Sequence, residues 1–176
     1  MRPGETIEAP HMGMRITCRE NSASSGGEVL GFDFWMRGGA TSPPLHVHPR
    51  QEERITVTSG SVRSRSGGVE RILSPGDTVV SPPGERHTVG PAGNEDVEMV
   101  AELRPALNYE RFIERSFALD RAGYINANGR GNPLRMATAG AQEAEFFVPR
   151  VPPGVQRSVL AAMERLAHRI GYDRIG

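Results

Sequence analysis

The sequence predicts an all-β protein, a sandwich or barrel of short antiparallel strands, with a helical tail. Up to about Pro105 the chain is rich in Gly, Pro, Thr and Val, and its short apolar runs are separated by turn residues. Many short strands at close spacing are typical of sandwiches and barrels. After Pro105 the apolar residues recur with the helical period of about 3.6 residues. We therefore divide the 176-residue chain into a barrel over residues 1–104 and a helical extension over residues 105–176, packed on the barrel or at a dimer interface.

The expected strands follow from the alternation of apolar and polar residues and from the turns between them. From Val97 to Leu103 every second residue is apolar, which indicates a strand with one buried face. The pair Gly67-Gly68 predicts a two-residue hairpin turn. The expected strands are Arg15–Glu20, Glu28–Arg37, Leu45–His48, Arg54–Thr58, Ser61–Ser66, Val69–Leu73, Thr78–Ser81, His87–Gly90 and Val97–Leu103.

Two helices are expected in the extension, with a polar loop over Asn126–Pro133 between them. Asn108 is placed as the N-cap of the first helix and Gly123 as its stop. We expect both apolar stripes to be core or dimer-packing faces. The first stripe contains Tyr109, Phe112, Ile113, Ser116 and Phe117, and the second contains Val155, Val159, Met163, Leu166 and Ile170.

Composition excludes several classes of protein. All 21 basic residues are Arg, so a Schiff-base or phosphate-loop lysine is impossible. The net charge is zero and no basic stripe stands out, so we expect no nucleic-acid partner. No apolar run has the length of a membrane helix and none resembles a signal peptide, so we expect a soluble, cytoplasmic protein without a membrane partner. The single cysteine, Cys18, excludes an intramolecular disulfide and is expected to be buried in a strand.

Two segments carry the residues with metal-binding chemistry. In the first, His46 and His48 are two residues apart in an expected strand and therefore project from the same face. Glu53 follows after a spacer of four residues, and its carboxylate can converge with the two imidazoles on one ion. In the second segment, His87 opens the strand that follows a Pro-Pro-Gly turn and supplies a third imidazole. Iron, nickel, copper and zinc suit imidazole ligands, and the carboxylate also admits manganese.

These segments resemble the two motifs of the cupin family. The first matches in both histidines, in Glu53 and in Gly60; the second matches in the four residues Gly76, Pro82, Gly84 and His87. The first motif's leading Gly is displaced by one residue, to Gly39, and Pro91 replaces the second motif's final Asn. Neither position is a metal ligand in the family. The resemblance covers roughly residues 28–104.

The resemblance implies a double-stranded β-helix barrel of the jelly-roll type, paired as a homodimer. It implies one divalent metal ion, with iron as the first expectation, held by His46, His48, Glu53 and His87. Three functions are open. The first is a mononuclear dioxygenase that acts on a small organic substrate, including an aromatic one, with Glu53 as both ligand and catalytic base. The second is a non-redox cyclase or isomerase similar to polyketide cyclases, and the third is a non-catalytic binder of a metal or ligand.

Several assignments stay open at this point. Glu52 is an alternative ligand to Glu53, but the seven-residue step to Gly60 favours Glu53. Phe32, Phe34 and Met36 share one face of their strand, and parity does not say whether it looks inward. If His46 and His48 face inward, Ile55, Val57 and Val89 do so as well. Arg37, Arg63 and Arg65 are candidates to hold a substrate carboxylate, although an exposed arginine without that role is the default expectation. His11 and His168 are expected to face solvent or to cap helices.

Overall fold

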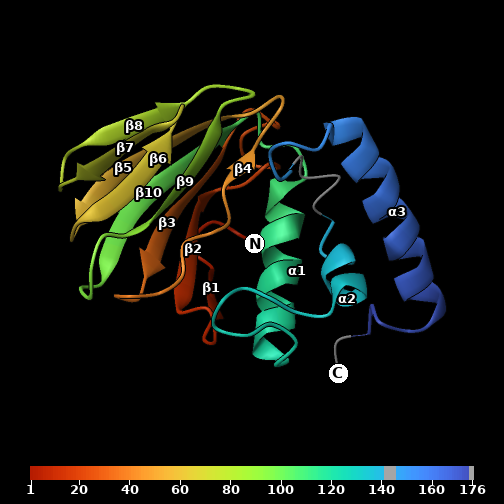
Figure 1. Ribbon diagram of the computed structural model, residues 1–176. Helices are drawn as coiled ribbons and strands as arrows, with labels where there is room; N and C mark the ends of the chain where they lie inside the picture. The colour runs from red at the N-terminus through yellow and green to blue at the C-terminus, as the bar shows by residue number, and fades with distance from the viewer. Residues whose placement is uncertain (141–145, 175–176) are drawn as a thin grey trace.

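The computed structural model describes residues 1–140 and 146–174, and within these ranges ten strands precede three helices (Figure 1). The strands are β1 (Thr6–Ala9), β2 (Met14–Glu20), β3 (Leu30–Met36), β4 (His46–Val47), β5 (Glu52–Ser59), β6 (Val62–Ser66), β7 (Val69–Leu73), β8 (Thr78–Ser81), β9 (Arg86–Pro91) and β10 (Val97–Arg104). The helices are α1 (Tyr109–Arg121), α2 (Pro133–Ala137) and α3 (Pro153–Arg169).

The strands form two antiparallel sheets that share one core. The larger has the order β1-β2-β3-β10-β5-β8, and the smaller has the order β4-β9-β6-β7. Apolar side chains of both sheets, such as Met99 of β10 and Val62 of β6, belong to a single buried cluster. Val97, Met99, Ala101 and Leu103 are at most 1% exposed, because β10 is a central strand that pairs with β3 and β5. The all-β prediction is confirmed.

The side chains of β3 show which face of the large sheet looks inward. Phe32, Phe34 and Met36 are buried in the core, whereas Trp35 points outward beneath the guanidinium of Arg15, 5.0 Å from the ring centroid. Cys18 is buried, as predicted.

The predicted hairpin turn is also present. Ser66 pairs with Val69 across Gly67-Gly68, and both glycines have a positive φ, +58° and +84°, which other residues rarely adopt.

Two short elements escaped the sequence analysis. Strand β1 lies at the edge of the large sheet and, within the described residues, pairs with β2; its alternation covers only four residues, with Ile7 and Ala9 turned inward. Helix α2 begins at Pro133, which the sequence placed in a loop, and the side chain of Asn132 caps it by accepting from the N–H groups of Leu134 and Arg135. Both elements are too short for a periodic pattern to reveal them.

The ends of α1 agree only in part with the prediction. Asn108 occupies the N-cap position, but its side chain makes no capping hydrogen bond, so the predicted cap is wrong in its chemistry. Gly123 ends the helix as expected, with a φ of +74° and an N–H that donates to the carbonyl of Asp120.

The helices lie together beside the barrel (Figure 1). Helix α1 packs against β1, and α2 packs against α3. Four apolar residues of the α3 stripe, Val155, Val159, Leu166 and Ile170, are 47–53% exposed. That face is therefore not part of the core within one chain, and its packing on a second copy stays a prediction. Among the described residues, no helix combines the length and apolarity needed to cross a membrane.

Candidate metal centre

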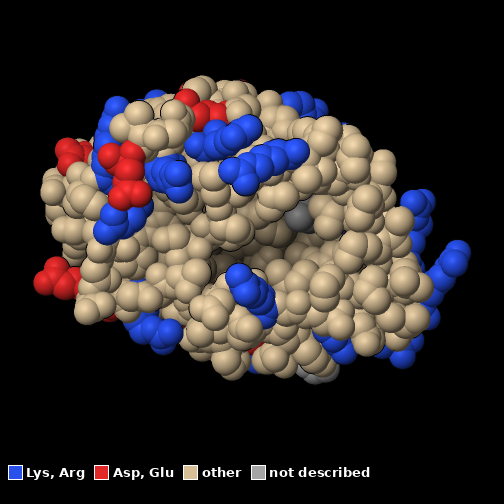
Figure 2. All heavy atoms as spheres, viewed as in Figure 1, with Lys and Arg blue, Asp and Glu red and all other residues tan. Residues whose placement is uncertain are grey.

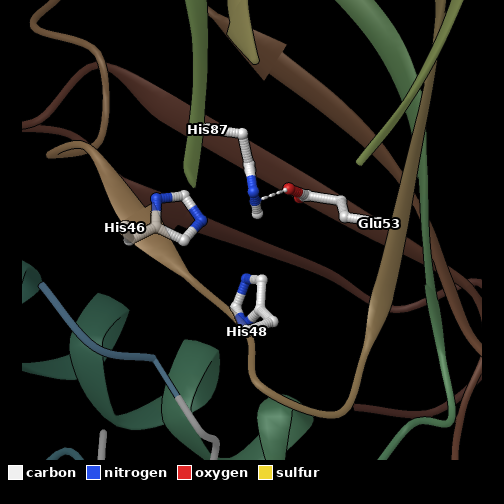
Figure 3. Close-up of side chains that lie close together, drawn as sticks. All are labelled: His46, His48, Glu53 and His87. Atoms are coloured by element: carbon white, nitrogen blue, oxygen red, sulfur yellow. Dashed lines mark ion pairs between the residues drawn. The ribbon is translucent and has the colours of Figure 1, made fainter. Parts of the chain in front are cut away.

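Four buried side chains with metal-binding chemistry converge inside the barrel (Figure 3). His46 comes from β4, His48 from just beyond it, Glu53 from β5 and His87 from β9. Each is between 1% and 8% exposed, and one ligand atom from each lies within 4.8 Å of the others. His46 and His87 face each other directly because they are register partners in the antiparallel pairing of β4 with β9.

Backbone carbonyls fix the orientation of two of the imidazoles. Nδ1 of His46 donates to the carbonyl of Pro44 at 2.8 Å, and Nδ1 of His87 donates to that of Glu85 at 2.9 Å. Since a carbonyl only accepts, each Nδ1 carries the proton and each Nε2 is left as the donor atom toward the centre. Metal-ligating histidines are typically held in this way.

One buried atom lacks the partner that a metal-free core would normally give it. Nε2 of His46 makes no hydrogen bond to any described residue, although a buried polar atom without a partner costs about 1–3 kcal/mol. Nε2 of His87 lies 2.6 Å from Oε2 of Glu53. Three imidazoles and one carboxylate around a common point, with an unsatisfied nitrogen facing it, fit a divalent metal ion.

In the metal-free cluster His46 is held neutral, whereas His87 shares with Glu53 a proton that a metal ion would have to displace. Burial lowers the pKa of His46 to about 3, which keeps its imidazole neutral. Burial alone would raise the pKa of Glu53, but the ion pair with His87 outweighs it and holds that pKa below its usual range. Likewise, burial works against a charged His87, and the carboxylate of Glu53 overcomes it to raise the pKa of His87.

We predict that acid destabilises the metal-free protein through His46. Between pH 6.5 and about 3 the unfolded chain holds a proton on this imidazole and the folded chain does not. As the pH is lowered through this window, the contribution of His46 therefore reduces the free energy of unfolding by about 1.4 kcal/mol for each pH unit. Urea unfolding of chelated protein at a series of pH values measures this slope. His46→Leu should remove the contribution and His168→Leu should keep it; equal slopes in all three proteins would refute the prediction.

The structure separates Glu53 from its alternative. Glu53 faces the three histidines, whereas Glu52 is half-buried, with its carboxylate 3.6 Å from the guanidinium of Arg54. This is the outcome expected from strand parity, because neighbouring residues of β5 point to opposite faces.

The other sequence-predicted candidates lie away from this cluster. His11 bonds to Asp120 and His168 to Asp173, both with exposed rings. Arg37, Arg63 and Arg65 are also exposed, and none of the three lines the cavity at the centre. The default expectation of exposed arginines is therefore confirmed, and none of the three is placed to hold a substrate carboxylate at the centre.

A cavity of about 200 Å³ opens beside the four residues and is lined by His46 and Glu53 among others. The face seen in Figure 2 is hollowed between the barrel and the helices. Ile55, Val57 and Val89 are all buried, as predicted from strand parity, and of the three Val89 also lines this cavity.

Much of the wall comes from residues that sequence reasoning did not assign to the site. Tyr109 and Phe112 project from α1, and the centroid of the Tyr109 ring is 5.2 Å from that of His48. Phe146 stacks on His46 with ring centroids 4.3 Å apart and on Phe112 at 5.1 Å. The apolar stripe of α1 pointed to Tyr109 and Phe112 as buried, but no local pattern marks Phe146.

The chain after Phe146 is tied to the edge of the small sheet. Phe147 exchanges two backbone hydrogen bonds with Val47 of β4, at 2.8 and 3.2 Å, and its side chain is fully buried. This pairing continues the sheet by one residue beyond β4 and positions Phe146 over His46.

The fold and the cluster together define a cupin-type barrel with a buried histidine and carboxylate centre. The family model for the cupin domain matches residues 34–101, which contain all four residues of the cluster. This region of the chain, residues 34–101, belongs to the cupin superfamily.

Two fungal relatives share the barrel region. An oxidoreductase from Pestalotiopsis fici is 32% identical over 93 residues, which are 51% of this chain and 46% of the relative. An oxidoreductase from Arthrobotrys oligospora is 33% identical over 96 residues, 53% of this chain and 36% of the relative. The matched region thus spans less than half of either relative.

Solved structures show the same fold at low identity. One from Thermotoga maritima, described as a predicted oxalate decarboxylase, has a TM-score of 0.50 and 16% identity and covers 56% of this chain and 97% of its own. Ectoine synthase from P. lautus has a TM-score of 0.50 and 15% identity and covers 58% of this chain and 72% of its own. These likenesses concern the fold alone.

Proposed function

We propose that this chain is a mononuclear metal enzyme that acts on a small organic substrate, and that it is a dioxygenase. His46, His48, Glu53 and His87 would hold one divalent ion. The observation that carries the proposal is the convergence of four buried donors, one of them an unsatisfied imidazole nitrogen, at the wall of an apolar cavity. Both fungal relatives are named oxidoreductases, which favours a dioxygenase over a non-redox cyclase or isomerase and over a non-catalytic binding protein.

The donor set narrows the ion without naming it. Three imidazoles and a carboxylate suit iron, zinc, manganese, nickel or copper, and iron is the ion that we expect for a dioxygenase. A bound metal would polarise a substrate oxygen, and iron would also bind dioxygen beside the substrate.

The protein's own residues supply the rest of the chemistry. The carboxylate of Glu53 lines the cavity and its lowered pKa keeps it ionised, so it can accept a proton from a bound substrate. Aromatic side chains above His46 exclude water, which strengthens electrostatic interactions at the centre. Pairing of β4 with β9 holds His46 and His87 in place before substrate arrives.

Elemental analysis of the untagged chain, purified without added metal, tests this proposal. About one iron per chain, with oxygen consumption on addition of monocyclic phenols or enediols, is the expected result. Stoichiometric zinc without oxygen consumption would replace the dioxygenase by a non-redox cyclase or isomerase. Failure to retain any metal after reconstitution would leave a ligand-binding protein without metal chemistry.

A further inference from the structure

The cavity beside the metal centre has an aromatic wall and very few ionisable groups. Five of the chain's six phenylalanines line it, together with Tyr109. Among the described lining residues, His46 and Glu53 are the ionisable groups besides Tyr109, and no arginine contributes. A charged substituent away from the centre would therefore lose its hydration without gaining a counter-ion, at a cost of several kcal/mol.

The size of the cavity limits the ligand to about one ring. An apolar cavity of about 150 Å³ holds a benzene molecule, and this cavity measures about 200 Å³. The cavity extends along α1, because Tyr109 and Ser116 both line it and are two turns apart on that helix. Seven residues at about 1.5 Å each separate them by about 10 Å along the helix axis. A ring with a short arm fits this space.

Ser116, at the end away from Tyr109, carries a polar group without a partner. Its Oγ is buried and makes no hydrogen bond to any described residue. A helical serine commonly bonds to the carbonyl four residues earlier, as Ser158 of α3 does to Gly154 at 3.1 Å. Buried hydroxyls without partners are rare, and a ligand that reaches Ser116 would satisfy this one.

We propose that the site takes an uncharged aromatic molecule of one ring with a short arm, whose terminal hydroxyl or carbonyl group hydrogen-bonds to Ser116. This inference rests on the proposed function, because it assigns the cavity as the substrate site. It adds the charge, the approximate length and a specificity-determining residue.

Four phenols of similar length test the charge of the arm. Tyrosol ends in a hydroxyl, para-propylphenol in a methyl, tyramine in an ammonium and para-hydroxyphenylacetate in a carboxylate. Calorimetric titration of chelated protein keeps the carboxylate from binding a metal. Tyrosol should bind at least about 10-fold more tightly than either charged compound. Equal or tighter binding of a charged compound, or no binding by any of the four, would overturn the proposal.

Ser116→Ala tests the hydrogen bond. In this variant the affinity for tyrosol should fall about 3- to 10-fold, which is the contribution of one hydrogen bond. The affinity for para-propylphenol should fall less than about 2-fold. Ser158→Ala, which removes an exposed serine of α3, should change neither. Equal weakening of both compounds by Ser116→Ala would show a merely structural role and overturn the assignment. Since these titrations need no metal and no turnover, their failure is distinct from a failure of the proposed enzyme activity.

Discussion

His87→Ala is expected to abolish stoichiometric metal binding while the barrel stays folded. His87 supplies one of four donors, and its Nδ1 is already oriented by the carbonyl of Glu85. Loss of groups that merely orient a ligand costs about 10- to 100-fold in metal affinity, so loss of a ligand should cost more than about 100-fold. Strand β9 should persist, because its backbone pairs with both β4 and β6. Elemental analysis and far-ultraviolet circular dichroism measure the two outcomes.

His168→Ala is the matched control for this prediction. It also removes a histidine, but an exposed one at the end of α3 that lies outside the four-residue cluster. It should retain the metal content of the unaltered chain. One metal per chain in both variants would contradict the assignment of His87 as a ligand.

Phe147→Ala should be among the most destabilising substitutions in the chain. The phenylalanine side chain is fully buried, and phenylalanine-to-alanine changes in such positions cost about 3–5 kcal/mol of unfolding free energy. Since Phe147 also anchors its segment to β4, the loss should free the N–H of Val47, which donates to the carbonyl of Phe147 at 2.8 Å. Urea unfolding measures the first effect and amide hydrogen exchange at Val47 the second.

The neighbouring residue offers a control for that substitution. Val148 is 45% exposed, so Val148→Ala should cost less than about 1 kcal/mol. It should leave exchange at Val47 unchanged. A similar cost for the two substitutions would show that the Phe147 segment does not hold the edge of the small sheet.

The first three residues of the centre, His46, His48 and Glu53, could be predicted from sequence patterns alone. The strand pairing that brings His87 to them could not. Strand parity placed His46 and His48 on one face, and the seven-residue step to Gly60 favoured Glu53 over Glu52. The position of His87 opposite His46 depends on a pairing between segments about 40 residues apart in the sequence. Spacing alone does not give such a pairing, and the resemblance to the cupin motifs supplied it.

The walls of the cavity depend still more on tertiary structure. Phe146 follows no periodic pattern, and it reaches His46 only because Phe147 pairs with β4. The apolar stripe of α3 shows the opposite case, a clear helical pattern whose residues are about half exposed within one chain. Periodicity therefore identified the two long helices and most of the strands, but did not say what each apolar face would contact.

A crystal structure of the metal-loaded chain, with anomalous diffraction at the absorption edge of the bound metal, tests the central claim most directly. We expect one strong peak about 2.0–2.3 Å from Nε2 of His46 and of His87, a ring nitrogen of His48 and the carboxylate of Glu53. A peak elsewhere, or none after loading, would contradict the four-ligand centre.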